Sequence, residues 1–187
     1  MHPDALPSAG VFGLLSWSLA FCVRHGAVIF GLALLAAVGR ALQVGRGGRW
    51  PKPVYGLAEI AVEAVRLVMV LAIVGFGDPF AGARAVGGLF SGAAFGAAIG
   101  RLLGGLKAHG LAALLDLAAF AVLAVLVNLA VFAIARWAPM LAAARRLSSG
   151  NADDKSLRLA VVLLLKNLTI IPFTAVWLWG MLLMLSH

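Results

Sequence analysis

The stretch GGLFSGAAFGAAIGRLLGG, residues 87–105, decides how this chain is interpreted. Within it glycine recurs at every fourth position, at Gly88, Gly92, Gly96, Gly100 and Gly104. Because residues four apart lie on the same face of an α-helix, these glycines would form one row without side chains. Glycine destabilises a helix in water by up to about 1 kcal/mol per residue relative to alanine. The sequence therefore needs an environment and an interaction that offset this cost.

A lipid bilayer supplies both. Helices in lipid associate mainly through close packing, and small residues let their backbones approach. We therefore expect residues 85–106 to form a helix that packs through these five glycines, which we call the glycine row, as a glycine zipper. Two arrangements are compatible with this pattern. The glycine row is either a seam inside one helix bundle, or a face for self-association or for lining a pore.

The composition indicates an integral membrane protein. Of the 187 residues 63% are hydrophobic and 12% are charged, whereas soluble domains average about 25% charged residues. The net charge of +8 comes from bases placed mostly at the ends of apolar runs, which is typical of membrane interfaces and gives no reason to expect nucleic acid as a partner. The single cysteine, Cys22, excludes an intramolecular disulfide. The abundance of Ala, Gly, Leu and Val, with more Arg than Lys, favours a bacterial plasma (inner) membrane.

The apolar runs predict a single all-α membrane domain covering residues 1–187. Residues 11–23 are too short to span a bilayer, so we expect an interfacial helix there, with a re-entrant arm as the alternative. The expected membrane helices cover residues 27–44, 54–77, 85–106, 111–135 and 157–185, with short turns at 78–84 and 107–110 and a polar loop at 136–156. The fold class is a polytopic integral membrane helix bundle of five transmembrane helices, or alternatively of four.

The number of spans depends on residues 85–106. The length of this segment and the two short turns beside it favour a fifth span. If the segment instead lies in the plane of the membrane, four spans remain. The basic residues of the two longer loops then gather on one side, as the positive-inside rule favours. We adopt five spans as the expectation.

Ionisable and amide side chains inside the predicted spans are the candidate functional residues, because a charge near the bilayer centre costs at least about 2.5–3.5 kcal/mol. In the five-span arrangement we expect the three acids of this set to meet Arg66, Arg101 and Lys107, and Lys166 to pair with Asn128. In the four-span arrangement Lys166 lies at the depth of Glu63. The set comprises Glu59, Glu63, Arg66, Asp116, Asn128, Lys166 and Asn167.

Pro172 predicts a helix break in the last span. Proline has no backbone N–H, so the carbonyl of Leu168 loses its helical donor. With Lys166 and Asn167 one turn earlier, the break indicates either a broken stretch that lines a cavity or an ordinary proline kink.

No catalytic motif, metal-ligand cluster or cofactor signature stands out in the sequence. We therefore expect a non-catalytic integral component of a bacterial membrane assembly, held by the glycine-zipper helix. The expected partners are the lipid bilayer and either further copies of the chain or other membrane subunits. The alternative is a small channel or transporter with an intramembrane charged path. A membrane-bound enzyme, or a haem-binding subunit that uses His25 and His109, is the third and weakest hypothesis.

Overall fold

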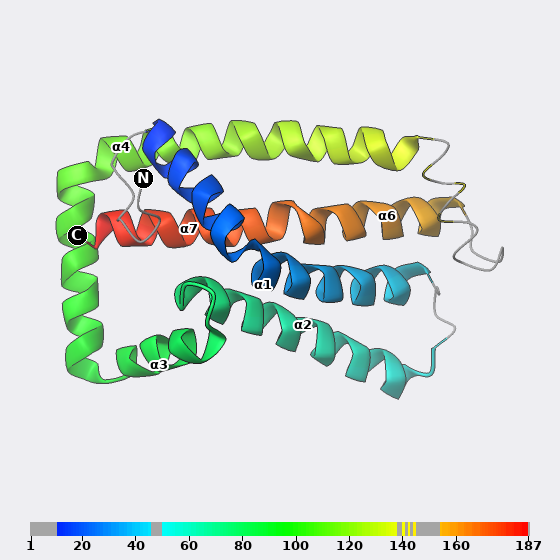
Figure 1. The fold of residues 1–187 in the computed structure, drawn as a ribbon, viewed down its shortest axis with the longest axis horizontal. Helices are drawn as coiled ribbons and strands as arrows, with labels where there is room; N and C mark the ends of the chain where they lie inside the picture. Colours follow the sequence, from blue (N-terminus) through cyan, green and yellow to red (C-terminus); the bar gives the residue numbers. More distant parts are fainter. Residues whose placement is uncertain are drawn as a thin grey trace. The chain divides into compact units, whose positions relative to one another are not determined.

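A computed structural model of the chain describes residues 11–45, 50–137, 140, 142, 144 and 154–186, and every regular element in these ranges is an α-helix. The helices are α1 (Val11–Gly45), α2 (Lys52–Val74), α3 (Pro79–Leu89), α4 (Gly92–Arg136), α6 (Asp154–Leu168) and α7 (Ile170–Leu185) (Figure 1). They fall into two compact units. Unit 1 contains residues up to 29, 69–123 and 173 onward, and unit 2 contains residues 30–68 and 124–172.

Three helical stretches are long and apolar enough to cross a membrane, namely Phe12–Val44, Gly92–Arg136 and Asp154–Leu185. The last one joins α6 and α7 across Thr169. This confirms an all-α membrane protein at the level of fold class. The predicted count of five spans is not confirmed. The predicted span at 54–77 corresponds to α2, which carries Glu59, Glu63 and Arg66 and is not among the three.

The predicted break in the helix between residues 11–23 and 27–44 is absent. The interfacial position expected for residues 11–23 stays a prediction. Helix α1 runs without interruption through the sequence Arg24-His25-Gly26. A glycine in a helix interior costs up to about 1 kcal/mol relative to alanine, but neither it nor a charged residue removes a backbone hydrogen bond. The local polarity at this point therefore does not end the helix.

The turn after α2 explains why that helix stops at Val74 and not at 77. Phe76 (φ 53°) and Gly77 (φ 98°) both adopt positive φ angles. The N–H of Gly77 donates to the carbonyl of Ala72 at 2.7 Å, and the N–H of Phe76 donates to that of Ile73 at 3.2 Å. This pair of bonds is the Schellman pattern that satisfies the last carbonyls of a helix.

Helix α3 begins where the sequence predicted only a turn. Asp78 is its N-cap, accepting a hydrogen bond from the N–H of Phe80 at 2.8 Å, and Pro79 occupies the first helical position. Both residues favour a helix start. The segment 78–84 is thus the beginning of α3, which corrects the predicted turn.

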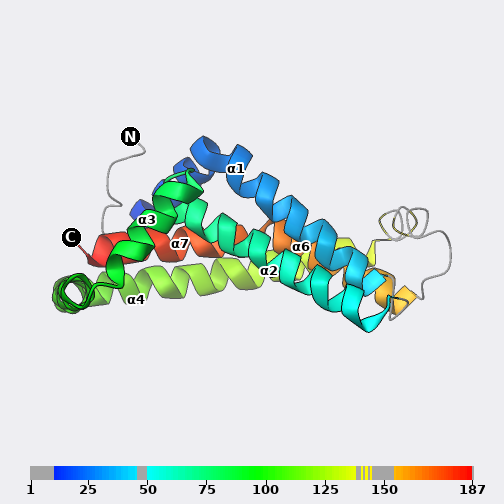
Figure 2. The ribbon, with the colours of Figure 1, turned by 90° about the horizontal axis from the view of Figure 1, so that it is seen from below.

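The predicted single helix over 85–106 is also wrong. Helix α3 ends at Leu89 and α4 begins at Gly92, so the glycine row is divided between two helices. The predicted turn at 107–110 is absent, because α4 continues through it to Arg136 and includes the predicted span at 111–135. Helix α4 is nevertheless bent. Its glycine-rich first part and its apolar second part run in different directions in Figure 1, and Figure 2 shows the first part end-on.

The last predicted span, 157–185, is divided near the expected break. Helix α6 ends at Leu168 and α7 begins at Ile170, so the interruption lies at Thr169, just before Pro172. The hydroxyl of Thr169 donates to the carbonyl of Leu165 at 2.7 Å. Most of the predicted polar loop at 136–156 lies outside the described residues, and α6 begins at Asp154, within the predicted loop.

Unit 1 is packed around the start of α1 and the end of the chain. Trp17 and Phe21 of α1 are buried, and Trp177 of α7 is 1% exposed. A Cβ at Gly180 of α7 would lie 2.6 Å from the Trp17 ring, so α1 and α7 approach closely there. Trp177 also contacts Phe120 of α4, with 5.3 Å between ring centroids.

Unit 2 is packed where α1 meets α2 and where α4 meets α6. A Cβ at Gly39 would lie 2.7 Å from Val62 of α2. On the other side of the unit Val131 and Ala135 of α4 form a buried cluster with Val161 and Val162 of α6. Gly39 and Gly180, which pack closely in the two units, both lie outside the glycine row. The sequence did not indicate these two contacts.

A first prediction concerns α3, which offers two glycines in opposite surroundings. A Cβ at Gly82 would collide with the carbonyl oxygen of Leu71, whereas a Cβ at Gly87 would have no described atom within 4 Å. We expect Gly82→Ala to destabilise the protein by about 1–3 kcal/mol through overpacking. We expect Gly87→Ala to leave stability unchanged or raise it by up to about 1 kcal/mol. Thermal unfolding of the two variants in the same detergent measures the difference, and equal midpoints would contradict the described packing of α3 on α2.

Candidate functional site

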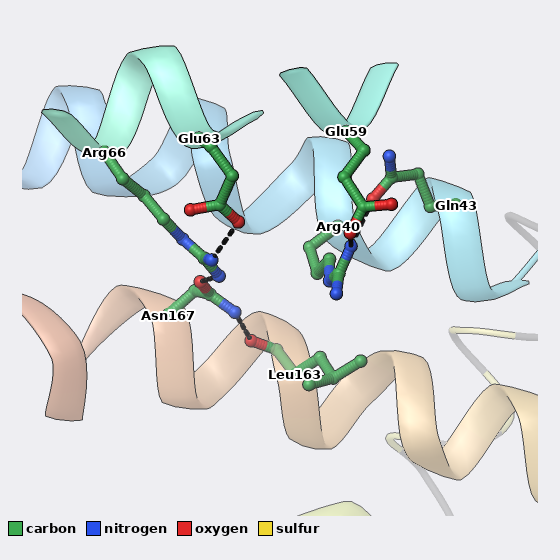
Figure 3. A network of polar contacts seen from close by, with 7 residues as sticks. All are labelled: Arg40, Gln43, Glu59, Glu63, Arg66, Leu163 and Asn167. Carbon is green, nitrogen blue, oxygen red and sulfur yellow. Dashed lines mark hydrogen bonds and ion pairs between the residues drawn. The ribbon is translucent and has the colours of Figure 1, made fainter. Parts of the chain in front are cut away.

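Two ion pairs stand close to one another in unit 2 and form the main polar feature of that unit (Figure 3). The first joins α1 to α2. Arg40 Nη1 donates to Glu59 Oε1 at 3.0 Å and to Gln43 Oε1 at 3.1 Å. Gln43 is 3% exposed, whereas the Glu59 side chain is 44% exposed. Arg40 itself is 26% exposed, so the pair is half-buried at its α1 end and more open at its α2 end.

The second ion pair continues to a third helix. Arg66 Nη1 donates to Glu63 Oε1 at 2.5 Å, one turn earlier on α2. Arg66 Nη2 donates to Asn167 Oδ1 of α6, and Asn167 Nδ2 donates to the carbonyl of Leu163 at 2.7 Å. Asn167 is 3% exposed. A buried amide with both polar atoms bonded fixes the guanidinium in place, so Arg66 ties α2 to α6.

The spacing of Glu59, Glu63 and Arg66 correctly placed all three on one face of a helix. It did not identify Arg40 and Gln43, which belong to the same network. The missed signal is their spacing in α1. Residues three apart near the end of a span lie on one face and can reach the acids of the next helix.

Lys166 and Asn128 do not form the pair that the sequence predicted. Lys166 Nζ lies 5.0 Å from the centroid of the Phe132 ring, in a cation–π arrangement. Asn128 Nδ2 donates to the carbonyl of Ala124 on its own helix at 2.8 Å. Because the Asn128 amide bonds its own helix, that donor is not shared with Lys166. The face of an aromatic ring attracts a cation through its quadrupole, and Phe132 presents such a face to Lys166.

Asp116 of α4 belongs to unit 1. Its side chain is 0% exposed, and neither carboxylate oxygen has a hydrogen-bond partner among the residues described. Of the predicted meeting of three acids with Arg66, Arg101 and Lys107, the contact between Glu63 and Arg66 is present. Glu59 bonds Arg40 instead, and the part of the prediction that concerns Asp116 is not seen among the described residues. A buried polar group without a partner costs about 1–3 kcal/mol.

The glycine row has no close neighbour among the residues that the structure describes. A Cβ at any of its five positions would have nothing within 4 Å in the described structure, beyond its own helical backbone and adjacent residues. The row is therefore not a seam inside the described part of a single chain. In α4 the partly covered stripe lies on another face and contains Ala94, Ala98, Leu102 and Gly105. The role of the row in helix packing stays a prediction.

A ridge of large apolar side chains borders the row. Phe95, Ile99 and Leu103 follow each other at four-residue spacing, one position before Gly96, Gly100 and Gly104. The three are 57%, 42% and 56% exposed. The first part of α4 thus presents a groove and a matching ridge side by side.

Comparison with known proteins does not assign this site. No family model matches the chain, and no curated protein or solved structure matches it either. The interpretation therefore depends on the two features described above, namely the polar network of unit 2 and the open glycine row of unit 1.

A second prediction concerns the contact between Arg66 and Asn167. In a double-mutant cycle of Arg66→Met and Asn167→Leu we expect a coupling free energy of about 0.6–1.7 kcal/mol, the range found for polar contacts between membrane helices. Reversible unfolding in mixed detergent micelles measures it. The matched control is the cycle of Arg66→Met and Glu59→Gln, because Glu59 bonds Arg40 instead. Additive effects in the first cycle would contradict the described contact.

Proposed function

We propose that this chain is a non-catalytic component of a bacterial plasma-membrane assembly, and that it assembles with further copies of itself through the glycine row. The observation that carries the proposal is the open face of the row, which has no described neighbour within one chain. A helical face that lowers helix stability and has no close contact within the described part of the chain is accounted for if a second molecule covers it.

A second copy is the partner that the shape of this helix favours. Ridges formed by residues four apart pack into grooves formed by residues four apart. Here the ridge of Phe95, Ile99 and Leu103 and the groove of the row are adjacent on one helix. In a twofold pair each copy inserts its ridge into the groove of the other, which is the self-complementarity that a symmetric dimer requires.

A third prediction tests this assembly. We expect Gly96→Leu to convert the oligomer to monomer, because the new side chain fills the groove. The control is Gly31→Leu, since Gly31 of α1 is also exposed, has nothing within 4 Å of its Cβ position and lies outside the row. Native mass spectrometry from detergent micelles gives the oligomeric state. A wild-type chain that is monomeric at all concentrations, or an oligomer that survives Gly96→Leu, would overturn the proposal.

The second candidate function is a small channel or transporter, and the polar network of unit 2 favours it. Charged groups inside membrane proteins commonly mark ion or substrate pathways. Glu59 and Glu63 keep 44% and 53% of their side chains exposed, so both pairs have an open acidic end. Lys166 adds a cation in the same unit.

A fourth prediction separates this candidate from the first. If the network conducts protons, proteoliposomes with an internal pH dye will acidify under an imposed potential, and Glu63→Gln or Lys166→Met will abolish the flux. Arg84→Gln is the control and leaves the flux unchanged, because Arg84 lies on α3 in unit 1, outside the polar network, and its side chain is 74% exposed. If the wild-type protein gives the same acidification rate as empty liposomes, the proton-channel candidate is contradicted, and the assembly proposal is not affected.

A further inference from the structure

We propose that the first part of α4, residues 92–106, is a lipid-binding helix that lies along the membrane surface, and that only the second part, from residue 111, crosses the bilayer. The partner of this surface is the headgroup and upper acyl region of anionic phospholipid. The proposal concerns the depth and the direction of the helix in a chain that is not paired through its ridge, because Phe95, Ile99 and Leu103 enter lipid here and enter the groove of a second copy in the oligomer proposed above.

The first observation is the length of α4 together with its bend. A helix of 45 residues extends about 68 Å at 1.5 Å per residue, whereas the hydrocarbon core is about 30 Å thick. The second part alone, from residue 111 to 136, extends about 39 Å and is sufficient to cross. The first part turns sharply away from the direction of the second (Figures 1 and 2). If the second part crosses the membrane, the first part runs along it.

The second observation is the contact at Gly105. A Cβ at this position would collide with the carbonyl of Leu185, the last residue of α7. The stretch Asp154–Leu185 is long and apolar enough to cross a membrane, so its last residue marks an end of a span. The first part of α4 therefore lies against the end of a crossing helix, at the level where hydrocarbon gives way to headgroups. Figure 1 shows the end of α7 meeting this part of α4.

The third observation is the distribution of side chains around the helix. At 100° per residue, Phe95, Ile99, Leu103 and Leu106 fall within an arc of about 80°, and all four are exposed. Arg101 and Lys107, which directly follows this segment, are exposed as well and fall outside that arc. Arg101 lies about 160° from the centre of the arc, on the opposite side of the helix, and Lys107 lies about 80° from that centre, beside the arc. Bases placed away from an apolar face attract anionic lipid when a helix lies in the interface plane.

The chemistry of the surface follows from these positions. The apolar arc enters the acyl region, and Arg101 and Lys107 lie at the level of the lipid phosphates. Arginine and lysine bind phosphate oxygens through charge-assisted hydrogen bonds. The small residues between the two bases keep the backbone close to the headgroups.

Cysteine labelling tests the direction of the helix. In a Cys22→Ser background, single cysteines replace Ala85, Ala108 and Ala121, all of which are exposed in the chain. A membrane-impermeant maleimide is added to sealed vesicles of known orientation, from outside and then after lysis. We expect Ala85→Cys and Ala108→Cys to be labelled from the same side and Ala121→Cys to be protected. Labelling of the first two from opposite sides would overturn the proposal.

Spin labels test the depth in nanodiscs that contain phosphatidylglycerol. Labels at successive positions 95–103 report collisions with oxygen, which concentrates in the acyl region, and with a water-soluble nickel complex. An interfacial helix gives a depth that oscillates with the helical period, with Leu103→Cys deep and Ala97→Cys shallow. A depth that changes steadily along the sequence identifies a crossing helix and refutes the inference.

Loss of the bases tests the lipid chemistry. With Arg101→Gln and Lys107→Gln combined, we expect the labels to become shallower in phosphatidylglycerol nanodiscs and to reach the depth seen for the parent in phosphatidylcholine. Unchanged depth would refute the role of anionic lipid. Because oligomeric state is measured separately, failure of these experiments is distinguishable from failure of the proposed assembly.

Discussion

The helices of this chain are held together where one partner has no side chain. Gly82 lies against the carbonyl of Leu71, Gly105 against that of Leu185, and Gly180 against the ring of Trp17. With few charges and a surrounding as apolar as the helices themselves, association depends on how closely backbones approach. The contact at Gly82 positions α3 on α2, and that at Gly105 positions the bend of α4 on the end of α7.

Polar side chains determine which faces of neighbouring helices meet. The hydrogen bonds of Arg66 to Glu63 and Asn167 set how α2 faces α6, and Arg40 does the same for α1 and α2 through Glu59. Each of these hydrogen bonds contributes little free energy, but it restricts how the two helices face each other, because the donors of the arginine are satisfied only in that orientation. Asp116 differs from both, since it is buried and has no partner among the described residues. A group kept at that cost is a natural first position for functional mutagenesis.

The sequence was sufficient for the fold class but not for the element boundaries. Its apolar runs predicted helices in nearly the right places, and the spacing of Glu59, Glu63 and Arg66 put them on one face. It failed at 78–84, where Asp78 and Pro79 start a helix although turn residues surround them. It failed again at 107–110, where α4 continues through residues typical of a loop. At 78–84 the helix-start signal of Asp78 and Pro79 is present in the sequence but stands among turn residues.

The candidate site shows the same limit. Regular spacing made the glycine row conspicuous, yet the glycines with close neighbours in α3 and α7 stand singly and follow no pattern. Partners for the ionisable residues depend on which helices are adjacent, and periodicity within one helix does not contain that information. Arg40 was overlooked for this reason, although its charge is plain in the sequence.

Lys166 gives the chain a possible response to electrical conditions. Arg40 and Arg66 are each balanced by an acid, whereas the described contact of Lys166 is the face of Phe132. No acid balances the ammonium group of Lys166 in the contact that the structure describes, so this group would interact with the electric field across an energised membrane. Moving one charge through that field changes the free energy by about 2.3 kcal/mol per 100 mV. Movement of α6 over even part of the bilayer would therefore depend on voltage.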